Sequence, residues 1–313
     1  MRMAAAPCLL AGVLLASTAP RGFALENGLG KTPALGWSSW NYFENGINET
    51  LVLSIAENVV SSGLRDAGYV YVNLDAGVWL PNRSATGELV ADKTKFPSGM
   101  ASLAAKLHAM KLKFGMYTDL SNRAVGKVCG TGPGSYGHYA QDMATMAKIG
   151  IDFLKVDYCA YDQNDPSHFI PSIQSSLESW KNLSAALNAT GRPIYSYFCP
   201  RSFGGSLTPP DPSTGGCKPK TRCIDDGPPH AWDAATRAGL ANTILTEFSN
   251  SKDEWSSAMS NLDAVIQLRP SPDWSGPGFF SDGDMLQVRA RCCRRCFRRC
   301  CCHRRCYCCC CSC

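Results

Sequence analysis

Polar, charged and aromatic side chains stand at the ends of successive β-branched or aromatic runs of this sequence. Lys155 and Asp157 are two residues apart, so on a β-strand both side chains point to the same face. The other residues of this kind are Trp37, Asp75, Tyr117, Asp119, Cys199, Asn250, Asp282 and Asp284. Aromatic faces pack on the C–H surfaces of sugars, and carboxylates accept hydrogen bonds from hydroxyl groups. The set therefore indicates a sugar-binding pocket.

Each of these residues also has an ordinary structural interpretation. A single Asp at a strand end is common in turns and helix caps. Lys155 and Asp157 could form a structural ion pair, and Trp37 and Tyr117 could be core residues. The five histidines are scattered, which argues against a histidine metal site and against a Ser-His-Asp triad. We therefore expect no metal and no cofactor.

The elements that must position these side chains alternate along the chain. Strands are predicted at residues 32–37, 69–75, 113–119, 151–157, 193–199, 243–249 and 278–282, and helices at 51–64, 100–112, 139–148, 170–187 and 253–266. This alternation predicts parallel strands joined by crossover helices. Seven strand–helix steps fit a (β/α)8 TIM barrel, in the α/β class, better than an open doubly wound sheet. The proline-interrupted glycines of residues 130–134 are predicted to form a turn, and residues 201–230 a long surface loop.

The composition fits a globular protein with an atypical end. The chain has 313 residues, of which 45% are apolar and 18% charged, which excludes a wholly disordered or fibrous protein. Residues 289–313 contain eight arginines, no acidic residue and twelve of the eighteen cysteines. The positive net charge of +5 therefore comes from this segment, and it does not indicate nucleic-acid binding by the rest of the chain. Because this segment lacks regular metal-ligand spacing, we expect a disordered tail that arises from a misread reading frame or exon boundary.

The first 24 residues are typical of a secretory signal peptide. Arg2 precedes an apolar stretch at residues 4–16, and the small residues Gly22 and Ala24 suit cleavage. The stretch is too short to span about 30 Å of hydrocarbon, so we expect no membrane anchor. Four Asn-x-Ser/Thr sequons begin at Asn48, Asn82, Asn182 and Asn188. The protein is therefore expected in the secretory pathway, outside the cell or in a lysosome or vacuole.

Eight motifs follow one another between residues 25 and 286, and they are TPALGWSSWNYFENGINE, YVNLDAGVW, FPSG, KLKFGMYTD, PGSYGHYAQD, GIDFLKVDYC, PIYSYFC and GPGFFSDGDML. The series resembles glycoside hydrolase family 27, the group of α-galactosidases and α-N-acetylgalactosaminidases. The resemblance implies a (β/α)8 barrel followed by an antiparallel β-domain. It also implies retaining hydrolysis of terminal α-galactosides in oligosaccharides, glycolipids or glycoproteins. A nucleic-acid partner is not implied, and a homodimer stays open.

The same resemblance assigns roles to particular residues. A retaining mechanism needs two carboxyl groups about 5 Å apart, and Asp157 matches the nucleophile. The ammonium of Lys155 would favour an ionised Asp157 and could bind sugar hydroxyls. Three residues fall on family positions that line the sugar pocket, and they are Trp37, Asp75 and Tyr117. Cys129 and Cys159 match a disulfide pair beside the pocket, which a secreted protein could form.

The second carboxyl group departs from the family pattern. In the family the general acid/base is an Asp in the motif R-x-x-x-D-I-x-D-x-W. Alignment on Trp255 places Asn250 at this position and Thr246 where the arginine should be. An amide can neither donate nor accept the proton, so this step should lose roughly 10²- to 10⁴-fold in rate. Glu247 and Asp253 are the nearby carboxylates that could substitute.

Two further motifs differ from the family. Its D-D-C-W reads DAGVW at residues 75–79, so Ala76 replaces a carboxylate that should bind the axial hydroxyl and select galactose over its epimers. The cysteine of that motif is absent, and its partner is replaced within residues 43–46. The family's C-E-W reads CPR at residues 199–201, where Cys199 could pair with Cys217 or Cys223.

After residue 286 no eighth strand and no β-domain can be recognised, so we expect an incomplete barrel. The expected organisation is a signal peptide at 1–24, a barrel domain at 25–288 and the tail at 289–313. We favour a secreted α-galactosidase-type hydrolase, or a truncated copy of one. The alternatives are a carbohydrate-binding relative that lost its proton donor and a secreted protein that acts through its cysteine-rich tail.

Overall fold

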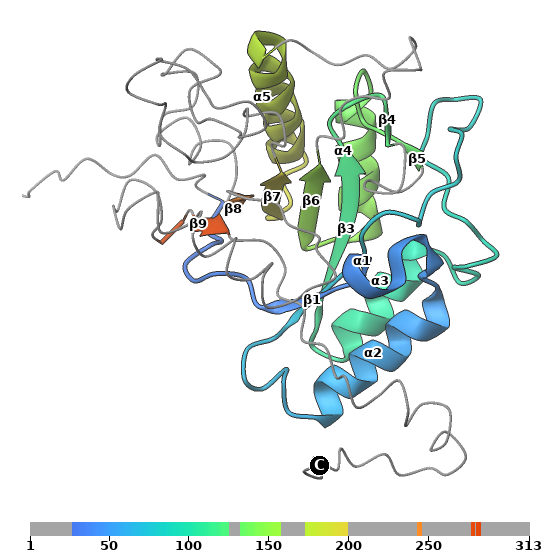
Figure 1. Cartoon of the computed structure of the whole chain (residues 1–313), viewed down its shortest axis with the longest axis vertical. Helices are drawn as coiled ribbons and strands as arrows, with labels where there is room; N and C mark the ends of the chain where they lie inside the picture. The colour runs from blue at the N-terminus through green and yellow to red at the C-terminus, as the bar shows by residue number, and fades with distance from the viewer. Residues whose placement is uncertain are drawn as a thin grey trace, which may run out of the picture.

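A single parallel sheet forms the centre of the molecule (Figure 1). The computed structural model describes residues 27–124, 132–157, 173–199, 243–245, 277–278 and 280–282. Within these residues the sheet has seven strands in the order β1-β2-β3-β6-β7-β8-β9, and every neighbouring pair is parallel. The strands are β1 Gly36–Ser38, β2 Tyr71–Asn73, β3 Lys113–Asp119, β6 Phe153–Asp157, β7 Tyr195–Cys199, β8 Thr243–Leu245 and β9 Phe280–Asp282. Strands adjacent in the sheet are thus successive along the chain, as in a (β/α) barrel.

Helices connect the first five of these strands and cover one side of the sheet (Figure 1). They are the short α1 Trp40–Phe43, which runs into the 3₁₀ turn η1 Glu44–Gly46, and the longer α2 Glu49–Ser61, α3 Met100–Ala109, α4 Tyr139–Ile149 and α5 Ile173–Ala189. Each of the four longer helices contacts the next one in chain order. The outer layer therefore follows the same order as the strands.

The sequence around α2 explains why the helix begins and packs where it does. The Oδ1 atom of Asn48 accepts a hydrogen bond from the backbone N–H of Leu51 at 3.0 Å, which caps the first turn. Val52, Ala56 and Val59 then follow at a spacing of four and three residues, and all three are buried. This apolar stripe faces the main core, so the helix is held by its cap and by one face.

Alternate side chains of the strands point to opposite sides of the sheet and belong to two different cores. On the helix side, Phe114, Met116, Leu154, Val156 and Phe198 belong to the main hydrophobic cluster and are fully buried. Their neighbours along each strand point to the opposite side, because side chains alternate across a strand. This pattern gives a β-sheet buried on both faces, as a barrel requires.

An aromatic cluster fills the other side of the sheet. It contains Tyr71, Phe153, Tyr195 and Tyr197, with Cys199 at its edge. The rings of Phe153 and Tyr195 are stacked with centroids 5.3 Å apart, and the ring of Tyr71 meets both edge-on. We call these four aromatic residues the aromatic floor. On β6, Phe153 precedes Lys155 and Asp157, so the floor lies below these two residues along the strand.

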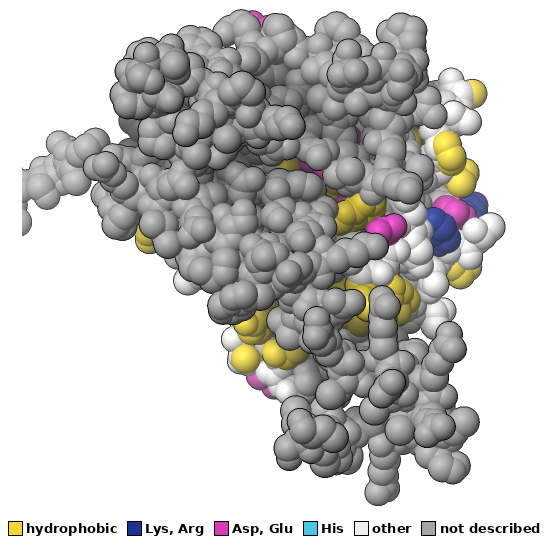
Figure 2. Space-filling model, in the orientation of Figure 1, with side chains coloured by type: hydrophobic (Ala, Val, Ile, Leu, Met, Phe, Trp, Pro, Cys, Tyr) yellow, Lys and Arg dark blue, Asp and Glu magenta, His cyan; other side chains and the backbone are white. Residues whose placement is uncertain are grey.

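The described surface carries only scattered large apolar side chains. They are Leu35, Tyr42, Leu64, Tyr69 and Leu80. On the face shown in Figure 2, hydrophobic side chains alternate with acidic, basic and other polar groups over the described part. Isolated exposed apolar residues of this kind are normal for a protein surface. No helix in the described ranges is both long enough and apolar enough to cross a bilayer.

Most predicted elements are confirmed where the structure describes them. The strand at 113–119 matches β3 at both ends, and five other predicted strands contain the observed ones. The first strand is shifted, because β1 ends at Ser38 instead of Trp37. Four predicted helices agree with α2, α3, α4 and α5 to within three residues. The predicted helix at 253–266, the loop at 201–230 and the segments 1–24 and 289–313 lie outside the described residues.

The predicted turn at residues 130–134 needs a correction at residues 132 and 133, while residues 130 and 131 lie outside the described part of the chain. Gly132–Pro133 forms strand β5, which pairs antiparallel with β4 Arg123–Ala124. The pair is held at its base, because the N–H of Gly134 donates to the carbonyl oxygen of Asn122 at 3.0 Å. Backbone hydrogen bonds pair these two short strands, so no alternation of apolar side chains indicates the pairing in the sequence.

Candidate active site

Four of the predicted site residues come together where β2, β3 and β6 end. Tyr117 of β3 and Lys155 of β6 are paired in register, and Asp157 is the last residue of β6. Asp75 lies two residues beyond the end of β2. The carboxyl ends of parallel strands meet at one edge of a barrel, which is where barrel enzymes place their reacting groups.

Lys155 and Asp75 form a buried ion pair. The Nζ atom of Lys155 lies 2.8 Å from Oδ2 of Asp75, and the two side chains are 12% and 3% exposed. Burial alone would lower the pKa of Lys155, but the charges of Asp75, Cys199 and Asp157 and the hydrogen bond to Asp75 raise it above its usual value. Lys155 is therefore a cation at physiological pH, and it places positive charge beside both carboxylates.

Tyr117 connects this pair to Asp157. Its hydroxyl donates a hydrogen bond to Oδ2 of Asp157 at 3.3 Å, and the Nζ atom of Lys155 lies 5.6 Å from its ring centroid, within the range of a cation–π contact. Burial, followed by the charges of Asp157, Asp119 and Asp75, raises the pKa of Tyr117 well above its usual value. The phenol therefore keeps its proton and can act as a donor to the carboxylate. Asp157 itself is buried.

Two contacts fix the loop that carries Asp75. The backbone N–H of Asp75 donates to Oγ of Ser39 at 2.9 Å, which ties the loop to the segment after β1. The backbone N–H of Ala76 donates to Oδ1 of Asp75 at 2.8 Å. The two carboxylate oxygens of Asp75 therefore have different partners, one on its own loop and one on Lys155.

Asp119 and Cys199 occupy the same row of the sheet as Asp157. The three residues are paired in register across β3, β6 and β7. Asp119 is fully buried, and its Oδ1 atom accepts hydrogen bonds from the N–H and the hydroxyl of Ser121. This is the ordinary turn role of Asp. Cys199 is buried, and both of its candidate partners, Cys217 and Cys223, lie outside the described residues.

Trp37 is not brought into this cluster by its described contacts. Its residue pair in the sheet is Val72, which belongs to the main core, and Trp37 packs against that core. Its ring centroid lies 6.0 Å from that of Phe43. These contacts favour the core-packing interpretation, and a role for Trp37 in the pocket stays a prediction.

Trp40 takes the place beside the site that was expected for Trp37. It is buried and packs together with Ala76 and Tyr117. Sequence reasoning missed Trp40 because the first strand was predicted to end at Trp37 instead of Ser38. A strand end placed one residue later would have directed attention to the residues that follow it.

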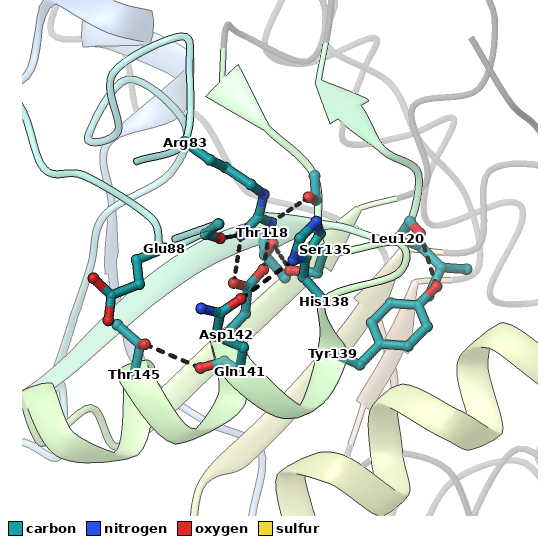
Figure 3. Close-up of polar contacts among 12 residues, drawn as sticks. Arg83, Glu88, Thr118, Leu120, Ser135, His138, Tyr139, Gln141, Asp142 and Thr145 are labelled. Carbon is teal, nitrogen blue, oxygen red and sulfur yellow. Dashed lines mark hydrogen bonds and ion pairs between the residues drawn. The ribbon is translucent and has the colours of Figure 1, made fainter. Parts of the chain in front are cut away.

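A second polar cluster braces the loop that follows β3 (Figure 3). The guanidinium group of Arg83 makes two contacts of 2.7 Å with the carboxylate of Asp142 in α4. It also donates to the carbonyl oxygens of Gly87 and Gly134, at 2.8 and 2.6 Å. Bidentate pairing of this kind gives both strength and a fixed geometry. Sequence reasoning passed over Arg83, although its partner Asp142 lies in the motif PGSYGHYAQD.

Several predicted residues lie outside the described part of the chain. They are Asn250 at the acid/base position, the proposed disulfide pair Cys129 and Cys159, and Asp284. Asp282 is the last residue of β9, and only its backbone is described. Within the described ranges, no group of three or more His, Cys, Asp or Glu side chains is arranged to hold a metal ion.

Comparison with known proteins identifies the family of this chain. The family described as Alpha galactosidase A matches residues 32–209, which is more than half of the chain. The chain is 35% identical over 286 residues to a probable alpha-galactosidase of Dictyostelium discoideum, covering 91% of this chain and 61% of that protein. It is 32% identical over 284 residues to alpha-galactosidase A of Homo sapiens, covering 86% of this chain and 57% of that protein. The chain thus spans less than two thirds of the length of these relatives.

Solved structures agree with the sequence matches. The crystal structure of alpha-galactosidase I from Mortierella vinacea has a TM-score of 0.62 and 27% identity, covering 84% of this chain and 61% of that one. The structure of the Saccharomyces cerevisiae enzyme with raffinose has a TM-score of 0.58 and 26% identity, covering 84% and 53%. The predicted barrel class is confirmed, and the seven described strands make an incomplete barrel. The chain belongs to the alpha-galactosidase family of glycoside hydrolases, family 27, as its motifs predict.

Proposed function

We propose that this chain is a retaining glycosidase of terminal α-D-galactosides and that Asp157 is its nucleophile. The observation that carries the proposal is the buried cluster at the ends of β2, β3 and β6, where Tyr117 donates to Asp157 and Lys155 pairs with Asp75. The proposal also rests on the family and on a relative's structure that contains raffinose, a galactoside. The proposed location is the secretory pathway, as residues 1–24 and the four sequons suggest.

The cluster suits the first half of a retaining reaction. An ionised Asp157 attacks the anomeric carbon, and a covalent glycosyl–enzyme bond forms as the bond to the leaving oxygen breaks. The positive charge of Lys155 attracts the carboxylate of Asp157, and the hydroxyl of Tyr117 orients one of its oxygens. The carboxylate of Asp75 can accept hydrogen bonds from sugar hydroxyls beside its own partner Lys155.

Both halves of the reaction need a second carboxyl group, which Asn250 cannot replace. In the first half an amide does not protonate the leaving oxygen, and in the second half it does not activate the water that releases the sugar. Asn250 therefore favours one alternative, a carbohydrate-binding relative that keeps the pocket but turns over slowly or not at all. Ala76 favours it too, because the wall beside Asp75 carries a methyl group packed against Trp40 instead of a second carboxylate.

The test is hydrolysis of 4-nitrophenyl α-D-galactoside with and without sodium azide. Nitrophenolate is a good leaving group that needs little protonation, and azide attacks the glycosyl–enzyme without a base. We expect azide to accelerate nitrophenolate release and to yield α-galactosyl azide. Asp157→Asn should abolish both, whereas the matched control Asp66→Asn, whose side chain is 70% exposed, should not.

Two other outcomes would contradict the proposal. If Asp157→Asn hydrolyses the substrate as fast as the parent, Asp157 is not the nucleophile. If the parent binds D-galactose in a calorimeter but releases no nitrophenolate with azide, the protein is the carbohydrate-binding relative and not a glycosidase.

A further inference from the structure

The segment that contains Asn45 and the loop that contains Gly77 both border the candidate site, and their backbones are in direct contact. A Cβ atom placed on Gly77 would lie 2.7 Å from Cα of Asn45, and Gly77 has a φ of +94°. Both observations require glycine at position 77, since other residues rarely adopt this φ and no side chain fits. The family pattern predicts a disulfide between these two loops, and neither loop contains a cysteine in this chain.

Lys95 joins the two loops at this contact. Its Nζ atom donates to the carbonyl oxygen of Asn45 at 2.9 Å and to that of Gly77 at 3.0 Å. Hydrogen bonds from a charged donor are roughly twice as strong as those between neutral groups. One ammonium group therefore connects η1, which contains Asn45, to the loop after β2, which contains Gly77, without a covalent bond.

The backbone around Lys95 is itself fixed, so the side chain is delivered to one place. The chain between Gly77 and Lys95 folds back on itself, with Trp79 and Ala91 forming an antiparallel bridge. The carbonyl oxygen of Lys95 accepts the N–H of Glu49, at the start of α2, at 2.9 Å. The next residue, Phe96, is fully buried in the main core.

Both loops held by Lys95 carry residues of the candidate site. Gly77 follows Asp75 and Ala76, and Asn45 lies in η1, directly after the helix that begins with Trp40. Trp40 and Ala76 pack together with Tyr117, which donates to Asp157. A shift of one loop relative to the other would therefore move Asp75 and Trp40 against Tyr117.

We propose that Lys95 is a positioning residue for the sugar pocket, which holds the Asp75 loop and the Trp40 helix at a fixed separation where the family pattern has a disulfide. Lys95 acts through these loops and not on the sugar. The inference rests on the proposed function only for its effect on galactoside binding. Its effect on the two loops is independent of any activity.

Hydrogen exchange of the full chain tests the effect on the loops. Lys95→Met removes the ammonium group and keeps the length of the side chain. We expect amides of residues 36–46 and 71–80 to exchange about tenfold faster, with α5 unchanged, because the local closing contact is lost. Lys95→Arg, which can donate to both carbonyls, should restore slow exchange. The matched control is Lys93→Met, since Lys93 is exposed and lies two residues away.

Binding separates a positioning role from a purely structural one. For 4-nitrophenyl α-D-galactoside in azide, Lys95→Met should raise KM by about five- to tenfold and change kcat by less than about twofold. The dissociation constant of D-galactose should rise in parallel. A structural role would instead lower the amount of folded protein, and hence apparent kcat, at unchanged KM.

Two results would overturn the inference. One is unchanged exchange in both loops of Lys95→Met together with unchanged galactose affinity. The other is global unfolding of Lys95→Met that Lys95→Arg does not repair, which would assign Lys95 to general stability. If the exchange result holds and the parent binds no galactoside, the positioning role stands and the proposed function fails.

Discussion

Replacing Lys155 by methionine should destabilise the protein strongly, because it leaves the Asp75 carboxylate buried without its cation. The two charges are 2.8 Å apart, and their side chains are only 12% and 3% exposed, so water cannot compensate for the loss. Breaking a buried pair by removing one partner costs about 3–5 kcal/mol. For a domain of this size, that corresponds to a fall in Tm of about 6–20 °C.

The pH dependence of this contribution follows from the raised pKa of Lys155. A cation whose pKa is raised on folding contributes fully below its unfolded value of about 10.4 and loses the contribution as pH rises through the folded value. The difference between parent and Lys155→Met should therefore be constant from about pH 6 to pH 9 and should shrink only at strongly alkaline pH.

Urea unfolding followed by circular dichroism measures this difference directly. The matched control is Lys148→Met, which removes an exposed lysine of α4 and should change stability by less than about 0.5 kcal/mol. The double variant Asp75→Asn/Lys155→Met should recover much of the loss, because the unpaired charge is then absent. The reasoning is refuted if Lys155→Met loses less than about 1 kcal/mol, or if the double variant is no more stable than the single one.

Two further ion pairs among the described residues, Arg83–Asp142 and Arg65–Asp66, give contrasting predictions. Arg83→Met should cost about 3–5 kcal/mol in urea unfolding, because Asp142 is 1% exposed, whereas Arg65→Met should cost less than about 1 kcal/mol, because its partner Asp66 is 70% exposed; equal losses would contradict this. Burial alone would raise the pKa of Glu49, but hydrogen bonds from Lys106 and Ser98 lower it from 4.5 to about 2. A lowered pKa means that stability is present above pH 4.5 and is lost as pH falls towards 2. Glu49→Gln should therefore flatten the decline in the free energy of unfolding between about pH 4.5 and pH 2, with Glu57→Gln, at an exposed position of the same helix, as the control.

The barrel strands were predictable because their sequences carry two signals at once. The run KFGMYTD alternates fully buried residues that face the helices with residues that face the barrel interior, and it ends in polar groups. A strand buried on both faces reads as a continuous apolar run, so β3 could be located at both ends. The meeting of Tyr117, Lys155, Asp157 and Asp75 then follows from the rule that parallel strands end at one edge.

The contacts that sequence reasoning missed depend on chain folding between distant segments. Trp40 reaches Tyr117 only because β1 ends at Ser38 and α1 begins two residues later. Arg83 and Lys95 act on carbonyl oxygens, whose positions depend on loop conformation and leave no trace in residue types. The short pair of β4 and β5 has the same cause, since its hydrogen bonds involve only the backbone.

The aromatic floor lies beneath Asp157 on the interior side of the sheet. Phe153 lies four residues before Asp157 on β6, and Tyr71, Tyr195 and Phe153 are in mutual contact. At about 3.3 Å per residue, these rings lie roughly 13 Å below the carboxylate, with Lys155 in between. Beneath the row of Asp157, packed aromatic side chains therefore fill the described interior face of β2, β6 and β7. A ligand of Asp157 is expected to approach from the carboxyl ends of the strands, and not through this packed layer.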